Sequence, residues 1–373
     1  MALVTGLLFV TIVIASGRGR AGAAVSAPSE HRPTGHTQMV ADLRHPGAAA
    51  SAPAPAPVTA CGRSLCAGPR RWVMYGATIY NPGLTPDRSG IRRPGSTVAL
   101  ARRAHLNTIR ITDFLGRDGP VATAPYDEAA WRRVDVMIAD AGASGMHVDL
   151  GLADYRNMMW NNCEDPYRAN WSRFIDFVAH RVNTVTGRVY NRDPTIALIS
   201  IAGEPLQIGA HSFRAAATNR PCTIAYSAAQ LTRFYASTLG EWAATRPTVM
   251  LNTGGLGYLN ESNSGIAWRS IMALPDNPVC DIKTYGGMAG FAATVARYCA
   301  RIGKPLIDEE FGWTQAAGDA ARARAFTGAL ARLTSIGVAG VAFWNLGYQQ
   351  AATSYDVGPG EPLTWAAVRT GRP

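Results

Sequence analysis

Eight short apolar runs recur along this chain, and most are followed by a longer stretch in which apolar side chains have helical spacing. Runs that stay apolar throughout are typical of strands buried on both faces, and strands that alternate with helices form parallel sheets. The runs are residues 72–80, 107–112, 147–152, 197–202, 248–252, 279–284, 305–309 and 339–344. Eight strand–helix units in roughly 300 residues predict an α/β fold, a single (β/α)8 TIM barrel.

The stretches between the runs predict helices at residues 127–143, 166–185, 228–244, 289–301 and 319–335. A doubly wound open sheet is the alternative, but its phosphate-binding G-x-G-x-x-G turn follows no early run. The sequence also lacks a P-loop and a metal-binding motif. It therefore implies no cofactor.

The N-terminal segment indicates export. Residues 2–15 form one apolar run, and the small residues 21–23 follow it, so we expect residues 1–23 to be a secretory signal peptide. No lysine or arginine precedes the run, which leaves a short uncleaved anchor as the alternative. Residues 24–60 are rich in proline and alanine and predict a disordered linker, with the barrel domain at residues 61–373. The expected location is extracellular, with attachment to the cell envelope as a further option.

An even number of cysteines agrees with export into an oxidising compartment. We expect three disulfide bonds, and zinc is disfavoured because no histidine cluster lies near the loosely spaced first pair. The expected pairs are Cys61–Cys66, Cys163–Cys222 and Cys280–Cys299.

The formal net charge of +10 comes almost wholly from arginines that are scattered along the chain without a long basic run. A solvated basic surface explains this pattern better than nucleic-acid binding does. We expect no nucleic-acid partner, no stable membrane span once the signal is removed, and a monomer. The 47% hydrophobic and 17% charged content exclude a disordered protein.

Two glutamates stand where catalytic residues of a parallel barrel stand. Glu204 follows the fourth apolar run and Glu310 follows the seventh, so both are expected at the same rim of the barrel. Two carboxyl groups on opposite sides of a sugar are the minimal equipment for cleaving a glycosidic bond. When the two groups lie about 5 Å apart, their charges favour one protonated acid and one ionised nucleophile.

With these segments the chain resembles glycoside hydrolase family 5, the cellulase and β-mannanase family of retaining (β/α)8 barrels, over about residues 70–350. The family has Asn-Glu-Pro after strand four, where this chain has Gly203-Glu204-Pro205. It has a glutamate before an aromatic-glycine pair after strand seven, matched by Glu310-Phe311-Gly312. The resemblance implies that Glu204 is the acid/base and Glu310 the nucleophile.

Glu309 competes with Glu310 for the nucleophile's position. Neighbours in a strand point to opposite faces, so we expect only one of the two inside the barrel. The aromatic-glycine pair selects Glu310, and Asp308 and Glu309 are then expected in a supporting or outer position.

Three further residues match the family's site. Arg110 is a charge inside a β-branched run, which is costly to bury without a partner, and the resemblance implies that it hydrogen-bonds the nucleophile. Tyr285, after strand six, is implied as a second donor to the nucleophile. Trp344, at the end of strand eight, is implied as the stacking platform for the sugar that is cleaved.

Two departures suggest a divergent subfamily. Gly203 replaces the family asparagine, which hydrogen-bonds the sugar 2-hydroxyl, and Gly151 stands near the place of the family's strand-three histidine. In addition, Lys283 stands where the family often has a histidine, two residues before Tyr285. Lys283 is therefore a candidate substrate contact. Other candidate cleft residues, for which packing among the loops is an equal alternative, are Asn252, Trp313, Asp154, Tyr155, Trp160, Asn161, Asn162 and Tyr258.

The expected function is a secreted retaining glycoside hydrolase acting on a β-linked polysaccharide or oligosaccharide, with mannan or glucan as the family default. Gly203 keeps a bacterial envelope glycan such as a galactofuranan open as the substrate. A carbohydrate-binding barrel with weak catalysis is a second alternative. A serine esterase is disfavoured because no G-x-S-x-G motif follows a predicted strand.

Overall fold

The structure is a computed structural model that describes residues 54–371, except 81–93, 113–125, 167, 216–217, 258, 260–263 and 287. The predicted signal peptide and most of the predicted linker lie outside the described residues. The fold belongs to the unit formed by residues 50–373. Within the described part of the chain, no helix is long and apolar enough to cross a membrane.

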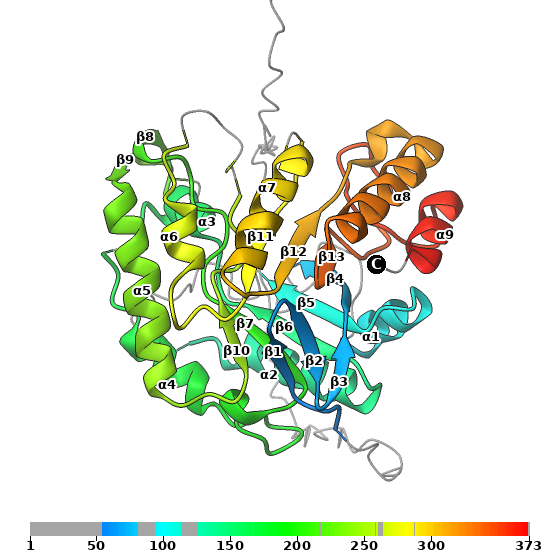
Figure 1. The fold of residues 1–373 in the computed structure, drawn as a ribbon, viewed down its shortest axis with the longest axis horizontal. Helices are drawn as coiled ribbons and strands as arrows, with labels where there is room; N and C mark the ends of the chain where they lie inside the picture. The colour runs from blue at the N-terminus through cyan, green and yellow to red at the C-terminus, as the bar shows by residue number, and fades with distance from the viewer. Residues whose placement is uncertain are drawn as a thin grey trace, which may run out of the picture. The chain divides into compact units, whose positions relative to one another are not determined.

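Eight parallel strands form the central sheet, and every predicted strand is found (Figure 1). In chain order they are β4 (Met74–Tyr80), β5 (Thr108–Thr112), β6 (His147–Gly151), β7 (Ile196–Ser200), β10 (Met250–Asn252), β11 (Cys280–Lys283), β12 (Leu306–Phe311) and β13 (Gly340–Phe343). Strand β13 pairs with β4, and a parallel bridge between Leu256 and Ile282 joins the chain after β10 to β11. The predicted (β/α)8 barrel is confirmed.

The helices lie outside the strands (Figure 1). They are α1 (Pro94–Arg103), α2 (Glu128–Ala143), α3 (Tyr155–Asn162), α4 (Ser172–His180), α5 (Ala228–Ala244), α6 (Trp268–Met272), α7 (Met288–Arg301), α8 (Asp319–Ser335) and α9 (Pro362–Thr370), with 3₁₀ turns η1 (Tyr190–Arg192) and η2 (Gln315–Ala317). N-caps explain where two helices begin. The Asp127 side chain accepts hydrogen bonds from backbone amides in the first turn of α2, and Ser227 forms a capping box with Gln230 at the start of α5.

The helix predicted at 166–185 is wrong at both ends, because only α4 is helical. Before it, the Trp171 indole donates to the carbonyl of Pro166 at 3.0 Å and holds a turn. After it, buried Asp135 accepts from the backbone and the hydroxyl of Thr184, at 3.2 and 2.8 Å. A distant carboxylate thus replaces the helical hydrogen bonds, which periodicity alone does not reveal.

Two small antiparallel elements were not predicted. Strands β1 (Val58–Cys61), β2 (Ser64–Ala67) and β3 (Arg70–Trp72) form one sheet, and β8 (Gly209–Arg214) pairs with β9 (Pro221–Tyr226) in a hairpin. All three predicted disulfides are present. The Cys163–Cys222 bond ties the end of α3 to β9, so the hairpin is covalently anchored beside the loop that follows β6.

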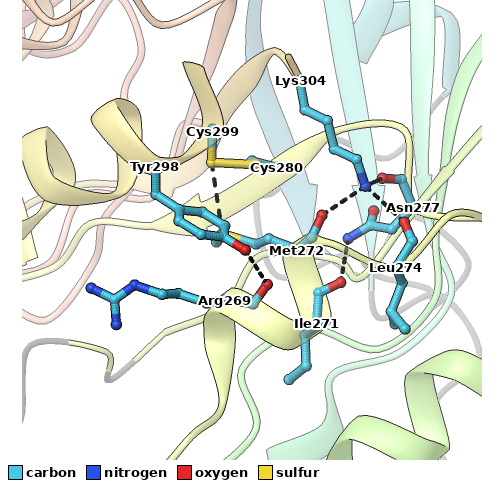
Figure 2. The surroundings of a disulfide bond; sticks show 9 residues. All are labelled: Arg269, Ile271, Met272, Leu274, Asn277, Cys280, Tyr298, Cys299 and Lys304. Carbon is cyan, nitrogen blue, oxygen red and sulfur yellow. Dashed lines mark hydrogen bonds between the residues drawn. A yellow bond between two sulfur atoms is a disulfide. The ribbon is translucent and has the colours of Figure 1, made fainter. Parts of the chain in front are cut away.

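The third disulfide, Cys280–Cys299, fastens β11 to α7 (Figure 2). Close by, the Lys304 ammonium donates to the carbonyls of Met272, Leu274 and Asn277 at 2.7, 2.7 and 2.6 Å. Helix α6 ends here, and its last carbonyls have no partner within the helix. Lys304 therefore caps this turn and fixes the chain where it enters β11.

The barrel interior is layered. Its lower layer is apolar and includes Met74, Leu198, Met250 and Ile307, together with Val58 and Leu65 from the small N-terminal sheet. Its upper layer is polar and includes Arg110, Asp149, Ser200, Asn252 and Glu309. The small sheet thus closes the floor of the barrel and leaves the carboxyl ends of the strands for the polar groups.

Leu65→Ala is expected to lower the free energy of unfolding by about 2–5 kcal/mol, because Leu65 is 0% exposed and its loss leaves a cavity in the barrel floor. Urea unfolding followed by tryptophan fluorescence measures the change. Leu363→Ala is the matched control, since that leucine is 52% exposed. Equal stability of the two variants would contradict the role of the small sheet as a floor.

Candidate active site

Glu204 lies four residues beyond the end of β7, and its backbone is in the left-handed region with φ of 49°. A residue other than glycine adopts this conformation only where its surroundings hold it. Here the Glu204 amide donates to the carbonyl of Gly255 at 2.9 Å, and its Oε2 lies 2.5 Å from Nη2 of Arg156. The turn therefore presents a nearly buried carboxyl group at the carboxyl end of the fourth barrel strand.

Glu310 lies on β12, where it accepts hydrogen bonds from two side chains and forms an ion pair with a third. Its Oε2 is 3.0 Å from Nη1 of Arg110 and 3.2 Å from Nζ of Lys283, and its Oε1 accepts from the Tyr285 hydroxyl at 2.8 Å. Two cations and a phenol thus orient one carboxylate. The sequence-predicted partners Arg110 and Tyr285 are both brought to Glu310.

The two glutamates share an electrostatic environment. Burial raises the pKa of Glu204, the cations Lys283 and Arg156 oppose this rise, and the negative charges of Asp154 and Glu310 add to it. The same lysine makes the 3.2 Å contact with Glu310. The net effect is a pKa of Glu204 above its usual value, next to a site in which Glu310 contacts the cations Arg110 and Lys283.

A polar layer lies beneath these groups. The Nε of Arg110 is 3.5 Å from both Asp149 Oδ2 and Glu309 Oε2. The Ser200 hydroxyl lies 2.6 Å from Asp149, and the Asn252 amide donates to Glu309. Burial raises the pKa of Asp149 and of Glu309, and Arg110 opposes the rise in both. Arg110 therefore links this supporting layer to Glu310.

The expectation that only one of Glu309 and Glu310 points into the barrel is wrong, because both reach Arg110. The register of β12 shifts against β11 between Ile282 and Lys283, and against β13 between Asp308 and Phe311. A bulge of this kind breaks the alternation of side chains between the two faces. Asp308 does lie apart, with its carboxylate accepting from the Thr284 hydroxyl, and burial raises its pKa to about 8.

Asn252 and Trp313 both pack into the rim of the barrel. Asn252 is completely buried beside Glu309, to which its amide donates, and the chain continues above it to Leu256 before it leaves the sheet. The Trp313 ring packs against Phe326 of α8 with centroids 5.2 Å apart. Both residues are positioned to support the fold of the rim.

The remaining predicted residues are distributed as follows. Trp344 is partly exposed directly after β13, and its amide donates to the carbonyl of Phe311 at 2.8 Å. Tyr155 is buried against Tyr226 and Phe234, so it belongs to the packing of α3. The side chains of residues 160–162 and all of residue 258 lie outside the described residues.

Sequence reasoning missed two charged residues of the site, Asp149 and Arg156. Asp149 carries the same signal that identified Arg110, a charge inside an apolar strand, and could have been found with it. Arg156 lies on helix α3, which was not predicted, and no local pattern connects it to Glu204. The described residues contain no group of three or more His, Cys, Asp or Glu side chains placed to hold a metal ion.

A (β/α)8 barrel whose fourth and seventh strands each deliver a buried glutamate to the carboxyl-end rim has the architecture of retaining glycoside hydrolases. In its fold and in part of its sequence, this chain is similar to mannanases and to a mannosidase of glycoside hydrolase family 5. No protein-family model matches the sequence.

Two curated rice proteins match in sequence. Mannan endo-1,4-beta-mannosidase 8 of Oryza sativa subsp. japonica is 27% identical over 173 residues, which is 40% of this chain and 46% of the rice protein. Mannan endo-1,4-beta-mannosidase 7 of the same plant is 26% identical over 168 residues, 39% and 44% of the two chains. This chain thus spans less than half the length of the curated relatives it matches.

Several solved structures share the fold. The endo-1,4-beta-mannanase from Rhizomucor miehei superposes with a TM-score of 0.66 at 17% identity, over 84% of this chain and 98% of that one. An endo-beta-1,4-mannanase from Thermotoga petrophila gives 0.63 at 17% identity, over 80% and 76%. A glycoside hydrolase family 5 mannosidase from Rhizomucor miehei gives 0.64 at 14%, over 84% and 96%. At these identities the likeness establishes the fold.

Arg156→Gln is expected to move the basic limb of the kcat/KM profile to higher pH. Arg156 lowers the pKa of Glu204, so its loss raises that pKa, and Glu204 keeps its proton to higher pH. The profile is measured with a substrate whose leaving group needs protonation, and exposed Arg168→Gln is the control. A limb that stays in place or moves to lower pH would contradict the assignment of Glu204 as the acid.

Proposed function

We propose that this protein is a retaining glycoside hydrolase of the endo-β-mannanase type, with Glu204 as acid/base and Glu310 as nucleophile. The observation that carries the proposal is the pair itself: a carboxyl group with a raised pKa interacts with Lys283, and the same lysine contacts a carboxylate that also accepts from Arg110 and Tyr285. The sequence relationship to plant mannan endo-1,4-beta-mannosidases supports β-mannan as the substrate.

The reaction takes two steps. In the first, Glu310 attacks the anomeric carbon while Glu204 gives its proton to the departing glycosidic oxygen, and a glycosyl ester forms on Glu310. In the second, Glu204 takes a proton from water, the water oxygen bonds to the anomeric carbon, and Glu310 leaves as a carboxylate. Two inversions at the same carbon give a product with the configuration of the substrate.

The neighbouring residues serve these two steps. Arg110 and Tyr285 fix both oxygens of Glu310, so the attacking oxygen is oriented before substrate arrives. Trp344 provides the aromatic platform under the sugar that is cleaved. The three disulfides support secretion, since such bonds persist in oxidising compartments.

Hydrolysis of β-1,4-mannan or mannohexaose, followed by proton NMR in the first minutes, tests the proposal. The β-anomer of the new reducing end is expected to appear first and then to mutarotate. Initial release of the α-anomer would contradict double displacement. Glu204→Gln should lose this activity, and equal activity of wild type and variant would remove the reaction from this site. Parallel assays on β-glucan and on a galactofuranan decide between the sugars.

A further inference from the structure

Two glycines make room for Lys283 and for its anchor Asp154. A Cβ on Gly203 would overlap the carbonyl oxygen of Gly254 and would lie 3.0 Å from Oδ1 of Asp154. A Cβ on Gly255 would lie 2.6 Å from Cγ of Lys283. The backbone therefore has no room for an asparagine at position 203, where Asp154 lies alongside, and Gly255 leaves the space that the stem of Lys283 fills.

Hydrogen bonds fix the turn that contains Gly254 and Gly255, next to Lys283. Oδ2 of Asp281 accepts from the hydroxyl of Thr253 and the amides of Gly254 and Gly255, at 2.7, 2.7 and 2.8 Å. Gly254 and Gly255 have φ of 98° and 90°, values that L side chains rarely adopt. This clamp keeps the two glycines against β7 and Lys283, so the arrangement is built into the rim.

Lys283 is 1% exposed and contacts two carboxylates. Its Nζ lies 3.0 Å from Asp154 Oδ1 and 3.2 Å from Glu310 Oε2. Burial lowers its pKa, but Asp154, Glu204 and Glu310 outweigh this effect and the net direction is upward, so the ammonium stays charged. An ammonium group carries three N–H donors, and the hydrogen bond to Asp154 engages one of them.

We propose that Lys283, anchored by Asp154, donates a hydrogen bond to the 2-hydroxyl of the sugar that is cleaved, and so replaces the side-chain amide that Gly203 lacks. The inference rests on the function proposed above. Glu310 attacks carbon 1 of the sugar, and carbon 2 is bonded to carbon 1. A donor 3.2 Å from the attacking carboxylate is therefore within reach of the hydroxyl on carbon 2.

The chemistry favours a cation in this place. A hydrogen bond from a charged donor is roughly twice as strong as one between neutral groups, and it strengthens as charge develops on the sugar in the transition state. Because Asp154 and Glu310 neutralise the ammonium, it does not repel the positive charge that develops at the anomeric carbon. Lys283 thus serves both the nucleophile and the substrate, whereas Asp154 is a positioning residue.

A double comparison of enzyme and substrate tests the proposal. We compare wild type, Lys283→Met and Asp154→Asn on 2,4-dinitrophenyl β-mannobioside and on its analogue without the 2-hydroxyl in the sugar that is cleaved. Lys283→Met is expected to lower kcat/KM for the parent substrate on the order of 100-fold. For the deoxy analogue, the loss should be at least tenfold smaller. Asp154→Asn should show the same pattern with a smaller loss.

Equal losses on the two substrates would overturn the inference and leave Lys283 as a partner of Glu310 alone. Lys283→Gln, which keeps a neutral donor, is the second variant if Lys283→Met does not fold, and it should retain part of the discrimination between the substrates. Circular dichroism and thermal unfolding check folding. Glu310→Ala, assayed on the parent substrate, tests the proposed function separately from the role of Lys283. If that variant keeps wild-type activity, the proposed function fails, whatever the Lys283 variants show.

Discussion

Glu310→Ala is expected to lower kcat on mannan and on aryl β-mannosides by on the order of 10⁴-fold or more, because the double displacement loses its nucleophile. The fold should survive, since Glu310 lies at the rim and its removal leaves Arg110 bound to Asp149 and Glu309. Initial rates by reducing-sugar assay, together with the thermal midpoint, measure the two effects. Glu241→Ala, an exposed glutamate of α5, is the matched control and should match wild type.

Azide distinguishes the nucleophile from the acid/base. In Glu310→Ala, azide takes the vacated place, bonds to the anomeric carbon as the leaving group departs, and gives a glycosyl azide of inverted configuration. In Glu204→Ala, an activated aryl mannoside still forms the ester on Glu310, and azide then releases a glycosyl azide of retained configuration. The opposite assignment of products by NMR would exchange the roles of the two glutamates.

Arg110→Met is expected to lower the free energy of unfolding by about 3–5 kcal/mol, the usual cost of breaking a buried ion pair by removing one partner. Arg110 is completely buried and lies within 3.5 Å of Asp149, Glu309 and Glu310. Denaturant unfolding measures the loss, with Arg132→Met as the control because Arg132 is exposed on α2. A loss no larger than that of the control would contradict the role of Arg110 as the centre of the polar layer.

The loss in free energy of unfolding caused by Arg110→Met should also depend on pH. Burial raises the pKa of Asp149 and of Glu309, and Arg110 restrains both, so its removal raises both further. When a carboxyl group has a higher pKa in the folded state than in the unfolded state, the free energy of unfolding falls as the pH rises from the unfolded-state pKa to the folded-state pKa. The variant should therefore be closest to wild type in acid and furthest from it at neutral pH, as unfolding at a series of pH values would show.

Much of the fold and part of the site followed from local signals. Period and length of the apolar runs predicted all eight barrel strands, and strand order alone placed Glu204 and Glu310 at the fourth and seventh strand ends. The three disulfide pairs were also predicted correctly. Arg110 could be found because a charge in an apolar strand requires a buried partner. Apart from the disulfide pairing, each of these signals acts over a few residues or follows from the parallel order of strands.

The sequence by itself thus determined the barrel, the order of its strands and the two glutamates at their ends, since burial and periodicity act along the chain. Only the tertiary structure decided how the site is completed. The bulge that turns Glu309 inward, the burial of Asn252 below the rim and the packing of Lys283 against Gly255 all depend on segments far apart in the chain. Close packing of such segments follows from side-chain volumes and backbone clearances in space, which no local pattern records.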